Sequence, residues 1–172
     1  MPHLTSLKVI LYFAFLSVLD HAVLPVFGIG GVYPSFLYLF VCYASFEWET
    51  KKTIPVAFWA GLLKDFIGGE LLGVQAGILV AMALLLDQVV RRIEREFPGI
   101  YFFITLLYVV FCELLKLFFG MFIGRVDGVL ASHIGTIILM GVYTALLLPF
   151  FGPLTRFAIG DRALSRQYEL FK

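Results

Sequence analysis

The stretch GLLKDFIGGELLGVQAG (residues 61–77) places two charged side chains and four spaced glycines in one of the most apolar parts of the chain. The apolar region around it, residues 53–90, has 38 residues, which as one helix would measure ~57 Å, about twice the thickness of a membrane's hydrocarbon core. The chain must therefore turn, and the Gly-Gly-Glu sequence at 68–70 is the predicted turn because glycine pairs interrupt helices. The stretch thus predicts a helical hairpin within a membrane.

The composition of the whole chain also indicates a membrane protein. Of its 172 residues, 61% are hydrophobic and 15% are charged, whereas soluble domains are about 45–50% apolar. The mean hydropathy is +0.97, and so few polar side chains could not cover a soluble domain of this size. We therefore predict an all-α, polytopic integral membrane protein that forms one transmembrane domain over residues 1–172. The net charge of +1 gives no indication of a nucleic-acid partner.

Six apolar segments are predicted to span the membrane as helices joined by short loops. A spanning helix needs about 20 apolar residues, or fewer where neighbouring helices shelter its ends. The segment 33–46 is the shortest, so a five-span arrangement is the alternative. The first segment is interpreted as an uncleaved span because no clear small-residue cleavage site follows it. The predicted spans are approximately residues 8–27, 33–46, 53–67, 71–90, 100–123 and 129–151.

Basic residues are concentrated on one side of these spans, which predicts the orientation. The opposite loops contain a single basic residue, Arg125. Because basic loops stay in the cytoplasm, both termini are predicted to be cytoplasmic, and the even span number favours six. The basic tail, residues 160–172, is predicted to be either a short amphipathic helix or a frayed end. The ten basic residues on the cytoplasmic side are Lys8, Lys51, Lys52, Arg91, Arg92, Arg95, Arg156, Arg162, Arg166 and Lys172.

Five of the charged residues within the predicted spans form a predicted intramembrane layer. Their spans run in the same direction and carry the charges in the outer half, so we expect them near one level. Three interpretations are open: the charges pair and fix the helix order, they bind a partner, or they line a substrate or ion pathway. Lys64 and Asp65 point about 100° apart on a helix, so at least one needs a partner on another helix. The layer comprises Asp20, Lys64, Asp65, Glu113 and Lys116.

The glycines suggest close helix packing. Gly61, Asp65 and Gly69 lie four residues apart and share one helical face, and Gly73 and Gly77 continue the spacing beyond the turn. Glycines at this spacing let another backbone approach closely. The neighbour is either another helix of this chain or a partner, including a second copy in a homodimer. These five residues are the candidates for helix packing or partner binding.

No pattern in the sequence predicts an enzyme. Cys42 and Cys112 lie inside apolar runs without metal-binding or redox spacing, and they are interpreted as small buried residues. The histidines have no nucleophile or ligand cluster around them. We therefore predict no catalytic residue, metal site or cofactor.

The pattern G-x-x-x-D-x-x-x-G-x-x-x-G-V, formed by Gly61, Asp65, Gly69, Gly73 and Val74, resembles the central signature of the rod shape-determining protein MreD family. The chain length, the short loops and the proline-bearing apolar end of the last span agree with this resemblance. Lys64 beside the aspartate departs from the family pattern. The resemblance implies a multi-pass protein of the bacterial inner membrane, with no catalytic activity of its own, that organises or regulates peptidoglycan synthesis during cell elongation.

The resemblance also implies the partners. MreC would bind directly through its transmembrane helix and juxtamembrane region, in a lateral groove. RodA and a class B penicillin-binding protein would associate through the complex, and MreB would be linked on the cytoplasmic side. The alternative is the substrate-binding subunit of an energy-coupling-factor vitamin transporter, which is also a small six-helix membrane protein. That alternative is disfavoured because Ala14 and Ala22 are separated by Val18, so the docking pattern Ala-x-x-x-Ala is missing.

Overall fold

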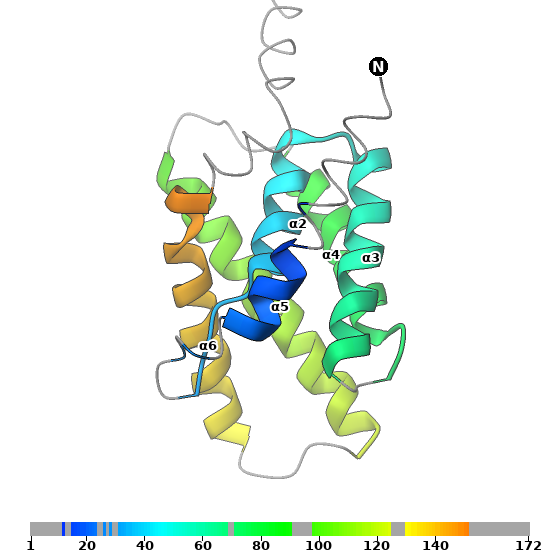
Figure 1. The fold of residues 1–172 in the computed structure, drawn as a ribbon, viewed down its shortest axis with the longest axis vertical. Coiled ribbons are helices and arrows are strands. Elements are labelled where there is room, and N and C mark those ends of the chain that lie inside the picture. Colours follow the sequence, from blue (N-terminus) through cyan, green and yellow to red (C-terminus); the bar gives the residue numbers. More distant parts are fainter. Residues whose placement is uncertain are drawn as a thin grey trace, which may run out of the picture.

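The computed structural model describes residues 12, 15–23, 26, 28, 31–68, 71–90, 98–124 and 130–151, and every regular element within them is helical. The predicted all-helical class is therefore confirmed, whereas the basic tail at 160–172 lies outside the described residues. A helical segment at 15–23 ends in the π-helical turn η1 and is called the 15–23 segment below. The elements in order are η1 (Leu19–Val23), α2 (Phe36–Glu47), α3 (Thr50–Gly68), α4 (Val74–Val90), α5 (Pro98–Phe122) and α6 (Leu130–Leu146) (Figure 1).

Two helical stretches, Gly99–Phe122 and His133–Phe151, are long and apolar enough to cross a membrane, among the residues described. Two shorter apolar helices, Phe36–Glu47 and Val74–Val90, accompany them. The number of spans therefore stays a prediction.

The short helix α2 is the centre of the bundle. It contacts η1, α3, α4, α5 and α6, and every residue from Leu37 to Phe46 is buried. A helix that is apolar on all sides is suited to such a position. Its 12 residues give a length of ~18 Å, which its surrounding helices can shelter. This explains why the predicted segment 33–46 is short for a span.

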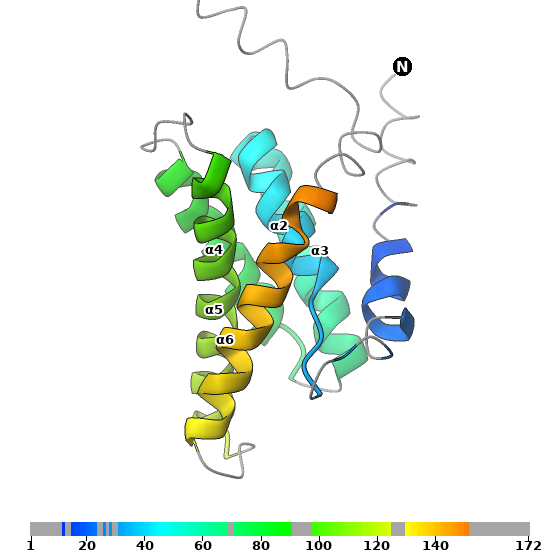
Figure 2. The same ribbon diagram turned by 90° about the vertical axis from the view of Figure 1, so that its left-hand side faces the viewer.

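The other helices surround α2 as antiparallel pairs. The helices α3 and α4 form one hairpin and α5 and α6 form another, and the 15–23 segment lies outside α2 on one side of the bundle (Figures 1 and 2). One apolar cluster lies between α2, α4 and α5 and includes Val41, Leu79 and Val109. A second cluster packs Leu16 of the 15–23 segment with Phe40 of α2 and Phe151 after α6. The 15–23 segment is thus held mainly against α2.

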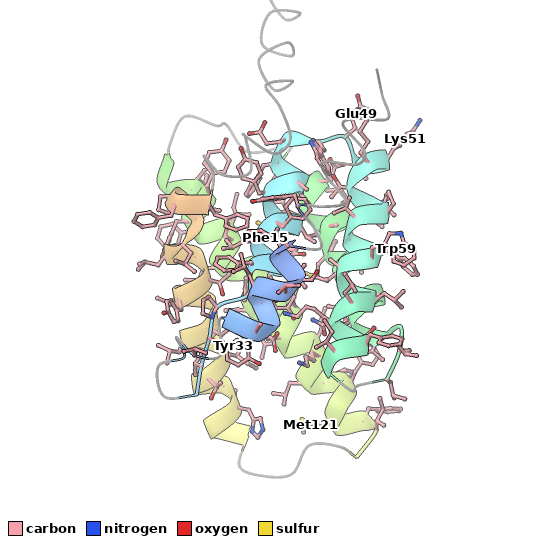
Figure 3. All side chains as sticks on the ribbon, in the orientation of Figure 1. Phe15, Tyr33, Glu49, Lys51, Trp59 and Met121 are labelled. Carbon is pink, nitrogen blue, oxygen red and sulfur yellow. The ribbon has the colours of Figure 1, made fainter. Side chains whose placement is uncertain are left out.

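Large apolar side chains cover the outer sides of the bundle. Phe66, Phe122 and Phe150 are exposed, Phe122 to 86% of its surface. In Figure 3, Trp59 projects outward from α3, whereas the polar residues Glu49 and Lys51 lie at one end of the bundle. A water-soluble monomer rarely exposes so much contiguous apolar surface, whereas lipid tails are a suitable environment for it. The surface therefore agrees with a membrane protein.

Candidate functional site

The hairpin of α3 and α4 depends on a close approach at Gly61. A Cβ atom added to Gly61 would lie 2.3 Å from the Cα and 2.5 Å from the N of Ala76 on α4. These separations are far shorter than van der Waals contact, so no residue with a side chain fits while the helices keep this distance. Gly61 therefore sets how closely the two helices pack.

Asp65 lies one turn after Gly61 and caps the start of α4. Its carboxylate accepts hydrogen bonds from the backbone N–H of Gly73 at 2.8 Å, Gln75 at 3.0 Å and Ala76 at 3.4 Å, and the residue is 1% exposed. The first N–H groups of a helix have no partner within the helix. Gly73, which directly precedes α4, has no side chain to serve as a cap, and Asp65 supplies the missing acceptor from the neighbouring helix.

The capping geometry also explains how a buried carboxylate is accommodated between α3 and α4. The start of a helix carries a partial positive charge, and backbone N–H groups inside a membrane have no water to bind. The N–H of Val74 is bound by the carbonyl of Leu71, so the first turn of α4 is fully satisfied. Asp65 is therefore stabilised by α4 itself, not by the adjacent Lys64.

The remaining glycines of the predicted series have different surroundings. Gly73 has a φ of +98°, a left-handed conformation that glycine adopts without strain. Gly77 is exposed, and a Cβ added there would meet no atom within 4 Å. Gly69 lies outside the described residues. Three glycines at one regular spacing therefore have different roles. Gly61 packs against the backbone of α4, Gly73 adopts a positive φ, and Gly77 faces open space.

Asp20 caps α2 much as Asp65 caps α4. Its carboxylate accepts hydrogen bonds from the backbone N–H of Phe36 at 2.6 Å and from the hydroxyl of Ser35 at 2.9 Å. Ser35 is the N-cap residue of α2, and its own N–H donates to the hydroxyl of Thr144 on α6 at 3.3 Å. The starts of α2 and α4 are therefore each bound by an aspartate from a preceding helical segment, Asp20 for α2 and Asp65 for α4.

Lys64 joins α3 to the Asp20 cap. Its ammonium donates to Ser35 Oγ at 2.7 Å and lies 3.9 Å from a carboxylate oxygen of Asp20. It also lies 3.7 Å from the centre of the Tyr38 ring, a favourable position for a cation. The Ser35 hydroxyl accepts from the lysine and donates to the aspartate, so the three residues form a continuous chain of charge-assisted hydrogen bonds.

Tyr38 extends this chain to α4 and α5. Its hydroxyl donates to Glu113 of α5 at 2.6 Å and accepts from the side-chain amide of Gln75 of α4. Since the backbone N–H of Gln75 binds Asp65, the two aspartate caps belong to one polar network. The network joins the 15–23 segment and the helices α2 to α5.

Four residues of the predicted charged layer thus belong to this network. Asp20, Lys64 and Glu113 are joined through Ser35 and Tyr38, whereas Asp65 is joined to them only through Gln75 of α4. Lys116, partly buried on α5, lies within electrostatic range of Lys64. Lys64 and Asp65 each contact a different helix, as their 100° separation on α3 leads one to expect.

Three residues of the network were not singled out from the sequence. Ser35 carries a signal, because a serine directly before an apolar helical run is a typical N-cap. Gln75 is a polar residue inside an apolar segment, which could have indicated a buried hydrogen bond. Tyr38 carries no signal, since its contacts depend on how α2 packs against α4 and α5.

An open apolar groove lies between the 15–23 segment and α3. It is lined by Ser17, Val18, Ala22 and Ile67 and has a volume of about 340 Å³. Val18 and Ile67 are exposed, Val18 to 62% of its surface. Ser17 and Ala22 are small, and small residues let another helix approach closely in a membrane. The groove lies directly beside the Asp20–Ser35–Lys64 chain.

The described residues contain no group of three or more His, Cys, Asp or Glu side chains that could hold a metal ion. Cys42 and Cys112 are both buried as free thiols. The arrangement of charges joins helices to one another, which is the first of the three interpretations of the charged layer.

Comparison with known protein families identified a match. The sequence model described as rod shape-determining protein MreD matches residues 2–158. Neither the curated proteins nor the solved structures gave a match.

Proposed function

Because this chain belongs to the MreD family of rod shape-determining proteins, we propose that it is a non-catalytic scaffold of the bacterial elongation machinery that binds MreC and organises or regulates peptidoglycan synthesis. Family membership implies a role in rod-shape determination and agrees with the helical, apolar structure. The finer proposal places the protein in the inner membrane with six spans and both termini in the cytoplasm. RodA and a class B penicillin-binding protein associate through MreC, and MreB is linked at the cytoplasmic side.

The observation that carries the proposal is the groove between the 15–23 segment and α3. Its lining is apolar, and it is open at the side of the bundle, where a single transmembrane helix of MreC could reach it through the lipid. Helices associate in membranes through van der Waals packing, which small residues such as Ser17 and Ala22 favour.

The polar network supports a scaffold because it holds the helices in a fixed arrangement. Asp20, Ser35 and Lys64 connect three elements beside the groove, and Asp65 fixes α4 to α3. A partner helix would therefore meet a preformed surface, and preorganisation lowers the entropic cost of association.

A bulky residue in the groove tests the docking site. We expect Ala22→Trp to lower the amount of MreC retained when the tagged protein is purified in mild detergent, because the indole fills the space for the partner helix. Ala22 is itself exposed in the groove, so the folded bundle can accommodate the larger side chain.

The matched control is Ile138→Trp. Ile138 is 50% exposed on α6 and does not line the groove. This variant should retain MreC as the unmodified protein does. Equal retention of MreC by both tryptophan variants would show that the groove is not the docking site.

A further inference from the structure

The groove has two walls, the 15–23 segment and α3. The residues that line it are close in sequence to the residues that connect these walls. Ser17, Val18 and Ala22 lie within one turn of Asp20 on the 15–23 segment. On the other wall, Ile67 lies one turn after Lys64 on α3. The Asp20–Lys64 ion pair, at 3.9 Å, therefore joins the two groove walls.

The two halves of the 15–23 segment are held by different forces. Leu16 is fully buried and packs with Leu39 and Phe40 of α2. Further along, Leu19 still packs at the edge of this cluster, whereas Val18 and Ala22 are exposed and Asp20 adds its hydrogen bonds and ion pair. The position of this second half consequently depends on the polar contacts of Asp20 together with the packing of Leu19.

Asp20 also lies in an unusual turn. Residues Leu19–Val23 form a π-helix, a rare geometry that often occurs at functional sites inside helices. The helices α2 to α6 are all α-helices. The one π-helical turn described in this structure thus coincides with the residue that contacts both α2 and α3.

We propose that the Asp20–Ser35–Lys64 chain is a latch that sets the position of the 15–23 segment relative to α3 and thereby the shape of the groove. With the latch closed, the groove has the form that accepts a partner helix. Release of the latch lets the segment move and lowers the affinity of the groove. This coupling rests on the proposed docking function, and by linkage a bound partner helix stabilises the closed latch to the same extent.

Removal of the lysine should open the latch while leaving the α2 cap in place. Lys64→Met keeps the length of the side chain but removes the charge, and Asp20 still accepts from Ser35 and from the N–H of Phe36. The remaining carboxylate then lacks its counter-ion, which is unfavourable in a buried site. Ser35→Ala is a second variant, because it removes the hydroxyl that bridges the two charges.

The distance between the groove walls is the direct measurement. Spin labels on Val18→Cys and Ile67→Cys, both at exposed positions, report it by pulsed electron paramagnetic resonance in the protein without partner. We expect a narrow distribution for the closed latch and a broader one, shifted to longer distance, for Lys64→Met and for Ser35→Ala. The control Lys116→Met removes the other intramembrane lysine, on α5, and should keep the narrow distribution.

A narrow, unshifted distribution in folded Lys64→Met and Ser35→Ala would overturn the latch. Retention of MreC by the unlabelled proteins tests the coupling, since Lys64→Met should retain less MreC than the unmodified protein does. If Lys64→Met shows the broad distribution but retains MreC as the unmodified protein does, the coupling is wrong and the scaffold proposal stands. If the unmodified protein does not retain MreC, the scaffold proposal fails, and the distances without partner still decide whether the latch exists.

Discussion

Gly61 and Gly77 belong to the same series of residues spaced four apart in the sequence, but in the structure one is tightly packed and the other is open. Gly61 lies against the backbone of Ala76, whereas Gly77 faces open space within α4. The sequence spacing predicted that both lie on a packing face. Spacing indicates on which face of a helix a residue lies, but it does not give the distance to the neighbouring helix. The difference gives a test that uses the same substitution at two positions.

We expect Gly61→Ala to lower the free energy of unfolding by about 1–3 kcal/mol or more, because the added Cβ overlaps the α4 backbone and forces the helices apart. Gly77→Ala should instead raise it by roughly 0.5–1 kcal/mol, since alanine is favoured over glycine within a helix and nothing obstructs the methyl group. Thermal unfolding in detergent measures both. Equal effects of the two substitutions would contradict the packing of α3 on α4.

Among the charged residues, the adjacent pair Lys64 and Asp65 shows what residue patterns can predict. Their angular separation predicted that they would need different partners, and they have them. The identity of the partners was not predictable, because Asp65 binds backbone groups and backbone groups carry no signature in the sequence. Asp20 and Lys64 were placed in one layer by depth alone, and their separation is 3.9 Å.

At the scale of the helix, the ends of α2 and α4 are set by capping more than by hydropathy. The apolar run predicted from residue 71 begins as a helix only at Val74, because Gly73 has a positive φ. The start of α2 is likewise shifted to Phe36 by its N-cap, Ser35. Helix α3 instead begins earlier than predicted, at Thr50, because the charged Lys51 and Lys52 are helical although they are not apolar. Hydropathy therefore predicted the helices, and local hydrogen bonding decided their limits.

The Asp65 cap predicts a specific loss at the start of α4. In Asp65→Ala, the N–H groups of Gly73, Gln75 and Ala76 lose their acceptor. Gln75 and Ala76 are buried, and each buried donor left without a partner costs about 1–3 kcal/mol. We therefore expect a loss of about 3 kcal/mol or more in the free energy of unfolding, with a smaller loss in Asp65→Asn, which keeps one acceptor oxygen. In Asp65→Ala, the amides of Gln75 and Ala76 should also exchange hydrogen faster than in the unmodified protein.

Asp87→Asn is the control for this prediction. It removes a carboxylate near the other end of the same helix, and Asp87 has no part in the cap. Exchange at Gln75 and Ala76 should then be unchanged. If Asp65→Ala leaves that exchange as slow as in the unmodified protein, α4 does not depend on the cap.

For the molecule as a whole, composition and periodicity predicted an all-helical bundle, and the hairpin motif predicted the family that the comparison found. The central position of α2 and the contacts of Tyr38 with Glu113 and Gln75 were not predictable, because they depend on helix order and rotation in three dimensions. The lateral groove was expected from the resemblance, but its location beside the 15–23 segment comes from the structure. The orientation and the six spans stay predictions from the charge distribution.

The most direct test of the proposed function is to purify the tagged protein from its native membrane in mild detergent and to identify the proteins that accompany it. The proposal predicts MreC together with the peptidoglycan synthases RodA and a class B penicillin-binding protein. Recovery of an ATPase module of an energy-coupling-factor transporter, with no MreC, would contradict it.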